Sequence, residues 1–97
     1  MRIETLRHIK HTSQFKKDLR KSKRQGKDMD LLDIIVTKLA NDEPLPTKHR
    51  DHALTGSWQG FRECHVTPDW LLVYQKLDEN VLLLILTRLA SHSELDF

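Results

Sequence analysis

The apolar run at residues 81–87, Val-Leu-Leu-Leu-Ile-Leu-Thr, constrains the fold of this chain more than any other feature. An unbroken run of this length is typical of a central strand that is covered on both faces over at least part of its length. Two more strands are predicted before it, at residues 60–67 and 70–76, and turn residues at 67–69 and 78–80 separate the three. The C-terminal half is therefore expected to form an antiparallel meander, with His52 in the irregular segment that enters the sheet and residues 88–97 as a tail that is mostly loop.

The N-terminal half is predicted to contain a short strand and two helices. Residues 2–9 carry spaced apolar side chains and form the strand, and a helix follows from residue 12 or 13, where Thr or Ser can cap it, to about residue 25. After a stop at Gly26, Asp28 caps a second helix that has a broad apolar face and ends near Asn41. The expected order is β-α-α-β-β-β, in which a helix hairpin packs on an antiparallel sheet as an α+β fold.

Length and composition bound the class of protein. Ninety-seven residues, 31% charged and 38% hydrophobic, predict one globular domain over residues 1–97. No apolar run approaches the roughly 20 residues that span a bilayer, and the first residues do not resemble a signal peptide. The single cysteine, Cys64, excludes a disulfide framework and fits a reducing compartment. We therefore expect a cytoplasmic protein that has no membrane partner.

The charge is unevenly distributed along the chain. Residues 1–27 contain ten lysines and arginines and two acidic residues, whereas residues 28–97 contain six and twelve. The basic part suits a polyanion such as RNA, or an acidic protein partner. A solvated basic helix explains the charge equally well, so the charge alone does not choose between these roles.

Titratable and aromatic residues are concentrated between Arg50 and Trp70. These 21 residues contain two histidines, three acids, two arginines and two tryptophans. Such groups are costly to bury unless they are paired, so we expect them at the surface or in a cleft, in a candidate active site. The alternation of a strand places Phe61, Glu63 and His65 on one face and Arg62, Cys64 and Val66 on the other.

Metal and thiol chemistry are the weaker alternatives for this region. The residues with atoms that can bind zinc are His49, His52, Cys64, His65 and His92. However, Cys64 and His65 are expected on opposite faces, and no Cys-x-x-Cys pair is present. Cys64 is a candidate nucleophile, but the face that it shares with Val66 favours a buried thiol. Neither a metal ion nor a cofactor is therefore expected.

Acid–base cleavage of RNA fits these residues better. RNA carries its own nucleophile, the 2′-hydroxyl, so cleavage needs a base for that proton, an acid for the leaving 5′-oxygen and cations for the phosphate. Histidine titrates near neutral pH and can serve as acid or base, and arginine offers a permanent charge to phosphate. Exposed aromatic rings can stack an unpaired base. Single histidines are nevertheless more often structural than catalytic, and tryptophans such as Trp58 and Trp70 are more often in the core.

Three motifs together are similar to those of one known family. They are Gly56-Ser57-Trp58 followed by Gly60, His65-Val66-Thr67-Pro68-Asp69-Trp70, and the tail Ser91-His92-Ser93-Glu94-Leu95. In this combination the chain resembles the YafQ-type toxins of the RelE/ParE superfamily, which are ribonucleases of bacterial type II toxin–antitoxin systems. The likeness covers nearly the whole chain, including the basic first helix.

The resemblance implies both a fold and a function. The fold would be RelE-like, similar to that of microbial ribonucleases. The function would be a metal-independent, ribosome-dependent endoribonuclease, or mRNA interferase, that cleaves mRNA in the A site of the 70S ribosome and leaves a 2′,3′-cyclic phosphate. A cognate antitoxin would bind and inhibit the protein, and operator DNA would be bound only through that antitoxin.

The resemblance also implies roles for particular residues. The positions that match catalytic ones are His52, His65, Asp69 and His92. His92 would be the general acid, and one of the other three would be the base. Arg88 matches a phosphate-contacting position, and the further RNA-binding candidates are Trp70, Phe97, Arg62 and the helix cations Lys16, Lys17 and Arg20.

The tail departs from the family pattern Arg-Thr-Gly-Ser-His-Ser-Glu-Leu-Phe. Leu89 and Ala90 stand in place of Thr and Gly, which stiffens the approach to His92, and Asp96 precedes Phe97, which shifts Phe97 along the chain. Two other functions stay open: a ParE-like toxin that inhibits gyrase, and an inactive toxin that acts only in repression with its antitoxin. Cleavage of translated mRNA would indicate the ribonuclease, DNA-damage signalling would indicate the gyrase inhibitor, and absence of toxicity would indicate the inactive toxin.

Overall fold

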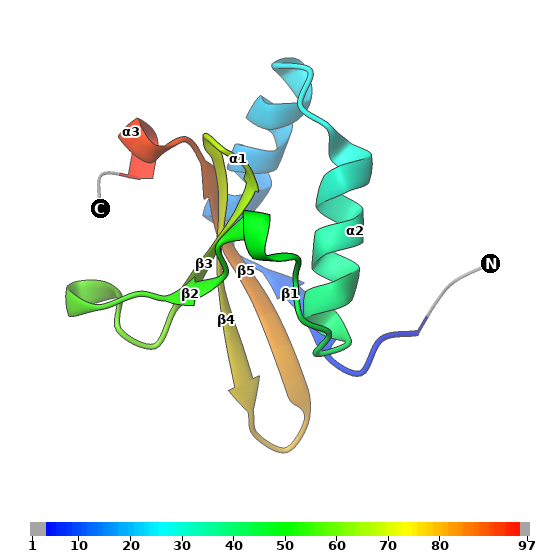
Figure 1. The fold of residues 1–97 in the computed structure, drawn as a ribbon. Coiled ribbons are helices and arrows are strands. Elements are labelled where there is room, and N and C mark those ends of the chain that lie inside the picture. Colours follow the sequence, from blue (N-terminus) through cyan, green and yellow to red (C-terminus); the bar gives the residue numbers. More distant parts are fainter. Residues whose placement is uncertain (1–3, 96–97) are drawn as a thin grey trace.

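The computed structural model describes residues 4–95. Its elements are β1 (His8–His11), α1 (Ser13–Arg24), α2 (Met29–Ala40), β2 (His52–Ala53), β3 (Arg62–Thr67), β4 (Trp70–Asp78), β5 (Leu82–Ala90) and α3 (His92–Leu95), with short 3₁₀ turns at Thr47–His49 and Gly56–Trp58. The strands form one sheet in the order β1-β5-β4-β3-β2. Helices α1 and α2 lie on one side of this sheet and α3 lies on the other (Figure 1). The predicted α+β fold, a helix hairpin packed on a sheet, is confirmed.

Strand β5 lies inside the sheet between β1 and β4, as its apolar run predicts. It pairs antiparallel with β4 but parallel with β1, so the sheet is mixed rather than wholly antiparallel. Leu84 and Leu86 are buried beneath the helices, whereas Leu83 and Ile85 on the opposite face are only partly covered. The apolar run therefore indicated the position of the strand correctly, and the second face is covered over part of its length, where Ala90 is buried.

Both long helices begin and end where their capping residues predict. Thr12 Oγ1 accepts a hydrogen bond from the Phe15 backbone N–H at 3.0 Å, and Asp28 Oδ1 accepts one from Leu31 N–H at 3.0 Å. Gly26 has a φ of +74°, a left-handed conformation that favours glycine and turns the chain from α1 into α2. The helix hairpin is thus specified by local sequence signals.

The core consists of two unequal clusters on the two faces of β4. The larger cluster joins the helices to the sheet through residues that include Phe15, Ile35, Leu39, Cys64, Val66, Trp70, Leu72 and Tyr74. The smaller cluster contains Leu71, Val73, Ala90 and Leu95, with Leu54, Trp58 and Phe61 packed against it. Leu95 thereby anchors α3 on the face of the sheet that the long helices leave open.

Three local predictions differ from the structure. The described part of the first strand is His8–His11, later than the predicted residues 2–9, and residues 1–3 lie outside the described chain. His52 lies in strand β2 rather than in a loop, because it pairs with β3. Residues 88–95 form the end of β5 and then α3, where a loop was expected.

A local signal for α3 was present in the sequence. Ser91 N–H donates to Glu94 Oε1 at 3.0 Å, and Glu94 N–H donates to Ser91 Oγ at 3.4 Å. This reciprocal pair is the capping box that a Ser-x-x-Glu sequence forms at the start of a helix. The four-residue helix is too short to show hydrophobic periodicity, so only the cap could have predicted it.

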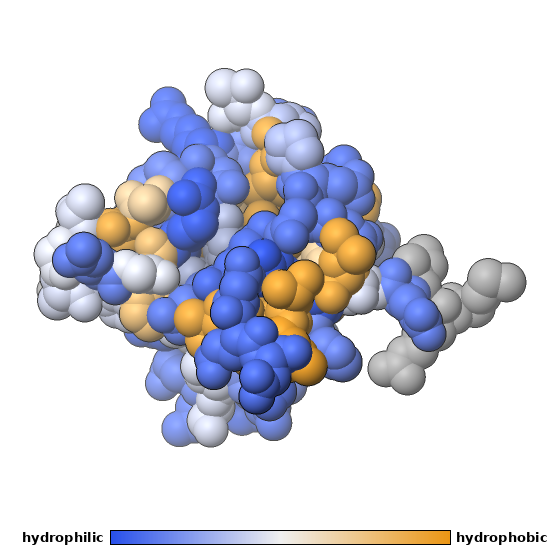
Figure 2. All heavy atoms as spheres, turned by 90° about the horizontal axis from the view of Figure 1, so that it is seen from below, coloured by the Kyte–Doolittle hydropathy of each residue, from blue (hydrophilic) through white to orange (hydrophobic). Residues whose placement is uncertain are grey.

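Figure 2 shows the end of the molecule that carries the β4–β5 turn, where hydrophobic patches alternate with hydrophilic side chains. Val81 and Leu82 at this turn are exposed large hydrophobic residues, as are Leu6, Ile9 and Ile34 elsewhere in the described chain. None of the helices within residues 4–95 is long and apolar enough to cross a membrane.

Candidate active site

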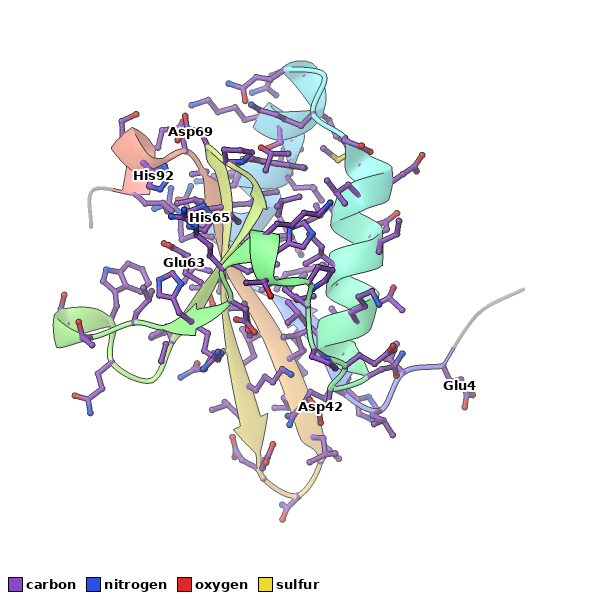
Figure 3. All side chains as sticks on the ribbon, in the orientation of Figure 1. Glu4, Asp42, Glu63, His65, Asp69 and His92 are labelled. Atoms are coloured by element: carbon purple, nitrogen blue, oxygen red, sulfur yellow. The ribbon has the colours of Figure 1, made fainter. Side chains whose placement is uncertain are left out.

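Three histidines and two carboxylates gather on the open face of the sheet. His52 comes from β2, Glu63 and His65 come from β3, Asp69 from the β3–β4 turn and His92 from the first position of α3. Figure 3 shows Glu63, His65, Asp69 and His92 on the side of the sheet away from α2. The ring centroids are 6.4 Å apart for His52 and His65, and 5.3 Å apart for His65 and His92. We refer to these five residues as the histidine row.

Glu63 lies between two histidines of the row. Its Oε1 is 3.6 Å from His52 Nε2 and 3.8 Å from His65 Nε2. Only 7% of the Glu63 side chain is exposed, and Oε2 has no hydrogen-bond partner among the residues that the structure describes. The charged form of a carboxylate so placed is stabilised chiefly by positive charge on its neighbours. Glu63 thus places one carboxylate beside both imidazoles.

Backbone pairing explains why these groups meet. His52 of β2 lies directly opposite Glu63 of β3, so their side chains share a face, and alternation along β3 adds His65 to that face. The predicted pairing of Glu63 with His65 on one strand face is confirmed. Sequence reasoning did not place Glu63 among the site residues, because the two-residue strand β2 that brings His52 to it shows no periodic signal.

Backbone carbonyl groups orient His52 of the row and the neighbouring His49. His52 Nδ1 donates to the Arg50 carbonyl oxygen at 2.5 Å, because a carbonyl can only accept. In the neutral ring this leaves Nε2, the atom that faces Glu63, without a proton and able to accept one. The His65 carbonyl oxygen accepts from Nδ1 of the buried His49 at 2.6 Å, so His49 supports the backbone of the row.

Asp69 holds His92 by two hydrogen bonds. Asp69 Oδ1 accepts from the His92 backbone N–H at 3.0 Å and from His92 Nδ1 at 2.8 Å. The His92 backbone N–H lowers the pKa of Asp69 most, followed by the imidazole, and the charge of Lys27 adds to the effect. Asp69 is therefore a carboxylate at neutral pH, and it leaves His92 Nε2 as the ring atom that can exchange a proton with a ligand. More than half of the His92 side chain, 57%, is exposed.

Helix α3, which carries His92, is attached to α1. Lys21 of α1 donates to Glu94 of α3. This bond from Lys21, together with the bonds from Ser91, lowers the pKa of Glu94 to about 2. The pair therefore persists across the neutral pH range and helps to fix the position of the tail.

Arg88 projects from β5 on the same face as the histidine row but is paired with an acid. Leu86 lies opposite Tyr74 and Arg88 lies opposite its neighbour Val73, so Thr87 is an extra residue in β5. Such a bulge turns the following side chain to the other face, and Val73 marks that face as the open one. Arg88 Nε donates to Asp18 of α1 at 2.8 Å.

Two further candidates for RNA binding, Trp70 and Arg62, do not lie on the open face with the histidine row. Trp70 is 2% exposed and its Nε1 donates to Ser22 Oγ at 3.0 Å, so its ring is packed in the core, as is more usual for a tryptophan, and not on an exposed surface. Arg62 lies on the opposite face of β3 from His65, where it contacts Tyr74 and Asp51, because alternate residues of a strand point apart.

The other basic and aromatic candidates lie on α1 or in the tail. Lys16, Lys17 and Arg20 are exposed on α1. Phe97 lies outside the described residues, so its role stays a prediction.

The structure also bears on the metal and thiol alternatives. Cys64 is fully buried on the helix side of the sheet, and burial raises the pKa of its thiol to about 12, so the interpretation as a buried thiol is confirmed. Within residues 4–95, no group of three or more His, Cys, Asp or Glu side chains is arranged to hold a metal ion.

Comparison with known proteins shows the family. Residues 7–96 match the family described as bacterial toxin of type II toxin–antitoxin system, YafQ. The chain belongs to the YafQ family. It is 40% identical over 90 residues to the mRNA interferase toxin YafQ of Escherichia coli strain K12, and this match covers 92% of the chain and 95% of the relative.

Solved structures of YafQ-like proteins share the fold. The E. coli DinJ–YafQ toxin–antitoxin complex contains a chain that is 40% identical, with a TM-score of 0.83 and coverage of 93% of this chain and 97% of that one. A metal-bound toxin from Helicobacter pylori is 46% identical, with a TM-score of 0.82 and coverage of 90% and 96%. The RelE-like fold that the sequence motifs implied is therefore confirmed.

Proposed function

We propose that the protein is an mRNA interferase, a metal-independent endoribonuclease that cleaves translated mRNA on the ribosome and is inhibited by a cognate antitoxin. The observation that carries this proposal is the histidine row, which combines potential acids and bases within one exposed strip. Related toxins of the same family carry the name mRNA interferase, and this supports the substrate class.

His92 is the proposed general acid. Its Nδ1 is occupied by Asp69 at 2.8 Å, so the ring is held in one orientation and its protonated form has a carboxylate beside it. His92 Nε2 would give its proton to the 5′-oxygen as that oxygen leaves phosphorus. Asp69 then serves His92 as a positioning residue, because a carboxylate with a lowered pKa and two hydrogen bonds from His92 is a weak base.

His52 or His65 is the proposed general base, and we favour His52. Its Nε2 is unprotonated in the neutral ring, and 48% of its side chain is exposed, against 13% for His65. His52 would take the proton of the 2′-hydroxyl as its oxygen attacks phosphorus and the bond to the 5′-oxygen breaks. Glu63 would stabilise the imidazolium so formed, and the product is a 2′,3′-cyclic phosphate.

Arg88 is the proposed cation for the phosphate. It projects on the open face with the row, and its guanidinium has five donors, of which Asp18 uses only some. A phosphate that gains charge in the transition state would bind the remaining donors. Cleavage by this scheme consumes no water and requires no metal ion.

The first experiment measures cleavage of an mRNA during translation by purified ribosomes. His92→Ala is expected to lower the rate by about 10²–10⁴-fold, the usual contribution of a general acid. His8→Ala, a change of an exposed histidine on β1, is the matched control and should cleave normally. Cleavage by His92→Ala at the wild-type rate would exclude His92 as the acid. If the unmodified protein caused DNA damage in cells and cleaved no mRNA, it would be a gyrase inhibitor instead. Activity that survives a chelator selective for zinc and copper would support metal independence.

The proposed antitoxin is testable separately. DinJ binds YafQ in the E. coli complex, and we propose that a corresponding protein neutralises this chain. Its gene is expected next to the toxin gene, and co-expression should restore growth and yield a stable complex. Operator DNA should bind the complex or the antitoxin and not the toxin alone.

A further inference from the structure

A groove of about 720 Å³ lies between α1 and the C-terminal tail. Five cationic residues line it, namely Lys17, Lys21, Arg24, Lys27 and Arg88. Trp70 and Ser22, joined by their hydrogen bond, also line it, so Trp70 contributes to this surface as a buried wall. Four of the ten lysines and arginines of residues 1–27 therefore face one concave surface.

Three of the five cations are available to a ligand. Lys21 and Arg88 are paired with acidic side chains, whereas Lys17, Arg24 and Lys27 form no ion pair with any residue that the structure describes. Lys17 and Arg24 are seven residues apart on α1, which corresponds to two helical turns and about 10 Å. Lys27 follows on the link to α2, so the unpaired charges extend along the groove.

The groove adjoins the histidine row at Asp69. Asp69 lines the groove and is also the residue that binds His92 at 2.8 Å. The charge of Lys27 reaches Asp69 strongly enough to contribute to the lowering of its pKa, after the two bonds from His92. A ligand that lies in the groove is therefore beside Asp69, the residue that holds the proposed general acid.

We propose that this groove binds the sugar–phosphate backbone of the RNA strand next to the bond that is cleaved. The proposal rests on the proposed ribonuclease function and adds the path of the substrate. Phosphates present a regular row of negative charge that lysine and arginine bind without reading the bases. An acidic peptide could satisfy the same charges, but it offers no bond on which His92 could act. RNA is therefore the ligand that the position of the groove favours.

A neighbouring side of α1 provides a matched comparison. Lys16, Arg20 and Lys23 repeat the spacing of Lys17, Lys21 and Arg24 one residue earlier, which is about 100° around the helix. They are exposed and do not line the groove. Charge alone made Lys16, Lys17 and Arg20 equal candidates for RNA binding, whereas the groove selects Lys17 and excludes the other two.

The test measures binding of a single-stranded RNA oligonucleotide with 2′-O-methyl riboses, which the full-length protein can bind but cannot cleave. The groove variant carries Lys17→Gln, Arg24→Gln and Lys27→Gln, and the control carries Lys16→Gln, Arg20→Gln and Lys23→Gln. Each variant loses two lysines and one arginine from exposed positions, so the change in net charge is the same. Fluorescence anisotropy at several salt concentrations gives the affinity and its salt dependence.

The groove variant is expected to bind at least about tenfold more weakly, and the slope of log K against log salt should fall by about 2 if three phosphate contacts are lost. The control should keep the wild-type slope. Equal losses in both variants would show diffuse attraction and overturn the proposal, as would absence of any loss in the groove variant. A short poly-glutamate peptide is the second probe. If the groove variant loses that peptide and keeps the RNA, the groove is a protein-binding surface and the proposal fails.

The test separates this proposal from the catalytic one. His92→Ala should bind the 2′-O-methyl strand as wild type does, because binding in the groove does not require the acid. If His92→Ala still cleaved RNA while the groove variant lost binding, the catalytic assignment would fail and the groove would stand. If His92→Ala lost cleavage while the groove variant bound RNA as wild type does, the groove proposal would fail and the catalytic assignment would stand.

Discussion

Glu63 places a carboxyl group where only 7% of its side chain is exposed and one oxygen lacks a hydrogen bond from the described residues. Such an arrangement costs stability, and it is kept where the charge serves chemistry. In the row, the charge lies beside His52 and His65, the two candidates for the base. At the residue scale, the same group is therefore expected to weaken folding and to support catalysis.

Glu63→Gln tests this opposition because it keeps the shape of the side chain and removes the charge. Cleavage should fall about tenfold or more, since the imidazolium formed during proton transfer loses its stabilising partner. The free energy of unfolding should rise by about 1 kcal/mol, since a poorly satisfied buried carboxylate is removed. Both quantities, from cleavage kinetics and urea unfolding, should stay unchanged in Glu79→Gln, a change of an exposed glutamate. A variant that is less stable and fully active would contradict the assignment.

At the element scale, α1 contacts the end of β5 that does not pair with β1. Strand β1 pairs only with residues 83–86 of β5, and beyond them Asp18 of α1 accepts the hydrogen bonds of the strand. The Asp18 carboxylate accepts from Arg88 Nε at 2.8 Å and from the Leu89 backbone N–H at 2.9 Å. Asp18 thereby joins the helix that lines the groove to the strand that leads to His92.

Asp18→Asn tests this connection. The amide keeps one acceptor oxygen but loses the charge that holds Arg88, so we expect a loss of about 1–3 kcal/mol in the free energy of unfolding. Cleavage should fall with it, because β5 leads directly into α3 and the position of His92 depends on that path. Urea unfolding and cleavage kinetics measure both effects. Asp33→Asn, at an exposed position of α2, is the control, and an equal effect of the two changes would show that Asp18 has no special role.

At the scale of the whole molecule, Arg7 ties together segments that are far apart in sequence. Its guanidinium donates to Asp42 at the end of α2, to Asp78 at the end of β4 and to the Leu83 carbonyl oxygen of β5. Lys76 also donates to Asp42 at 2.8 Å. The bonds from Arg7 and then Lys76 lower the pKa of Asp42 to about 2 from the model-compound value of 3.8.

The lowered pKa of Asp42 predicts a pH dependence of stability. A carboxylate whose folded pKa lies below its unfolded value stabilises the protein above about pH 4, and this contribution is lost as the pH falls through about 2. Asp42→Asn removes the charge and suits the left-handed backbone at this position, where φ is +55°. Wild type should therefore be more stable than Asp42→Asn at neutral pH, and the difference should shrink between pH 4 and pH 2. A difference in unfolding free energy that is constant with pH would contradict this.

The sequence by itself determined the features that depend on neighbouring residues. Capping by Thr12 and Asp28, the turn at Gly26, the alternation of Glu63 and His65 and the motifs of the YafQ family are all local, so they could be predicted without a structure. Only the tertiary structure decided which distant groups meet. Register places His52 opposite Glu63, a bulge turns Arg88 to the open face, and packing buries Trp70. These outcomes depend on strand order and on contacts across many residues, and the physical pattern of any one segment does not contain them.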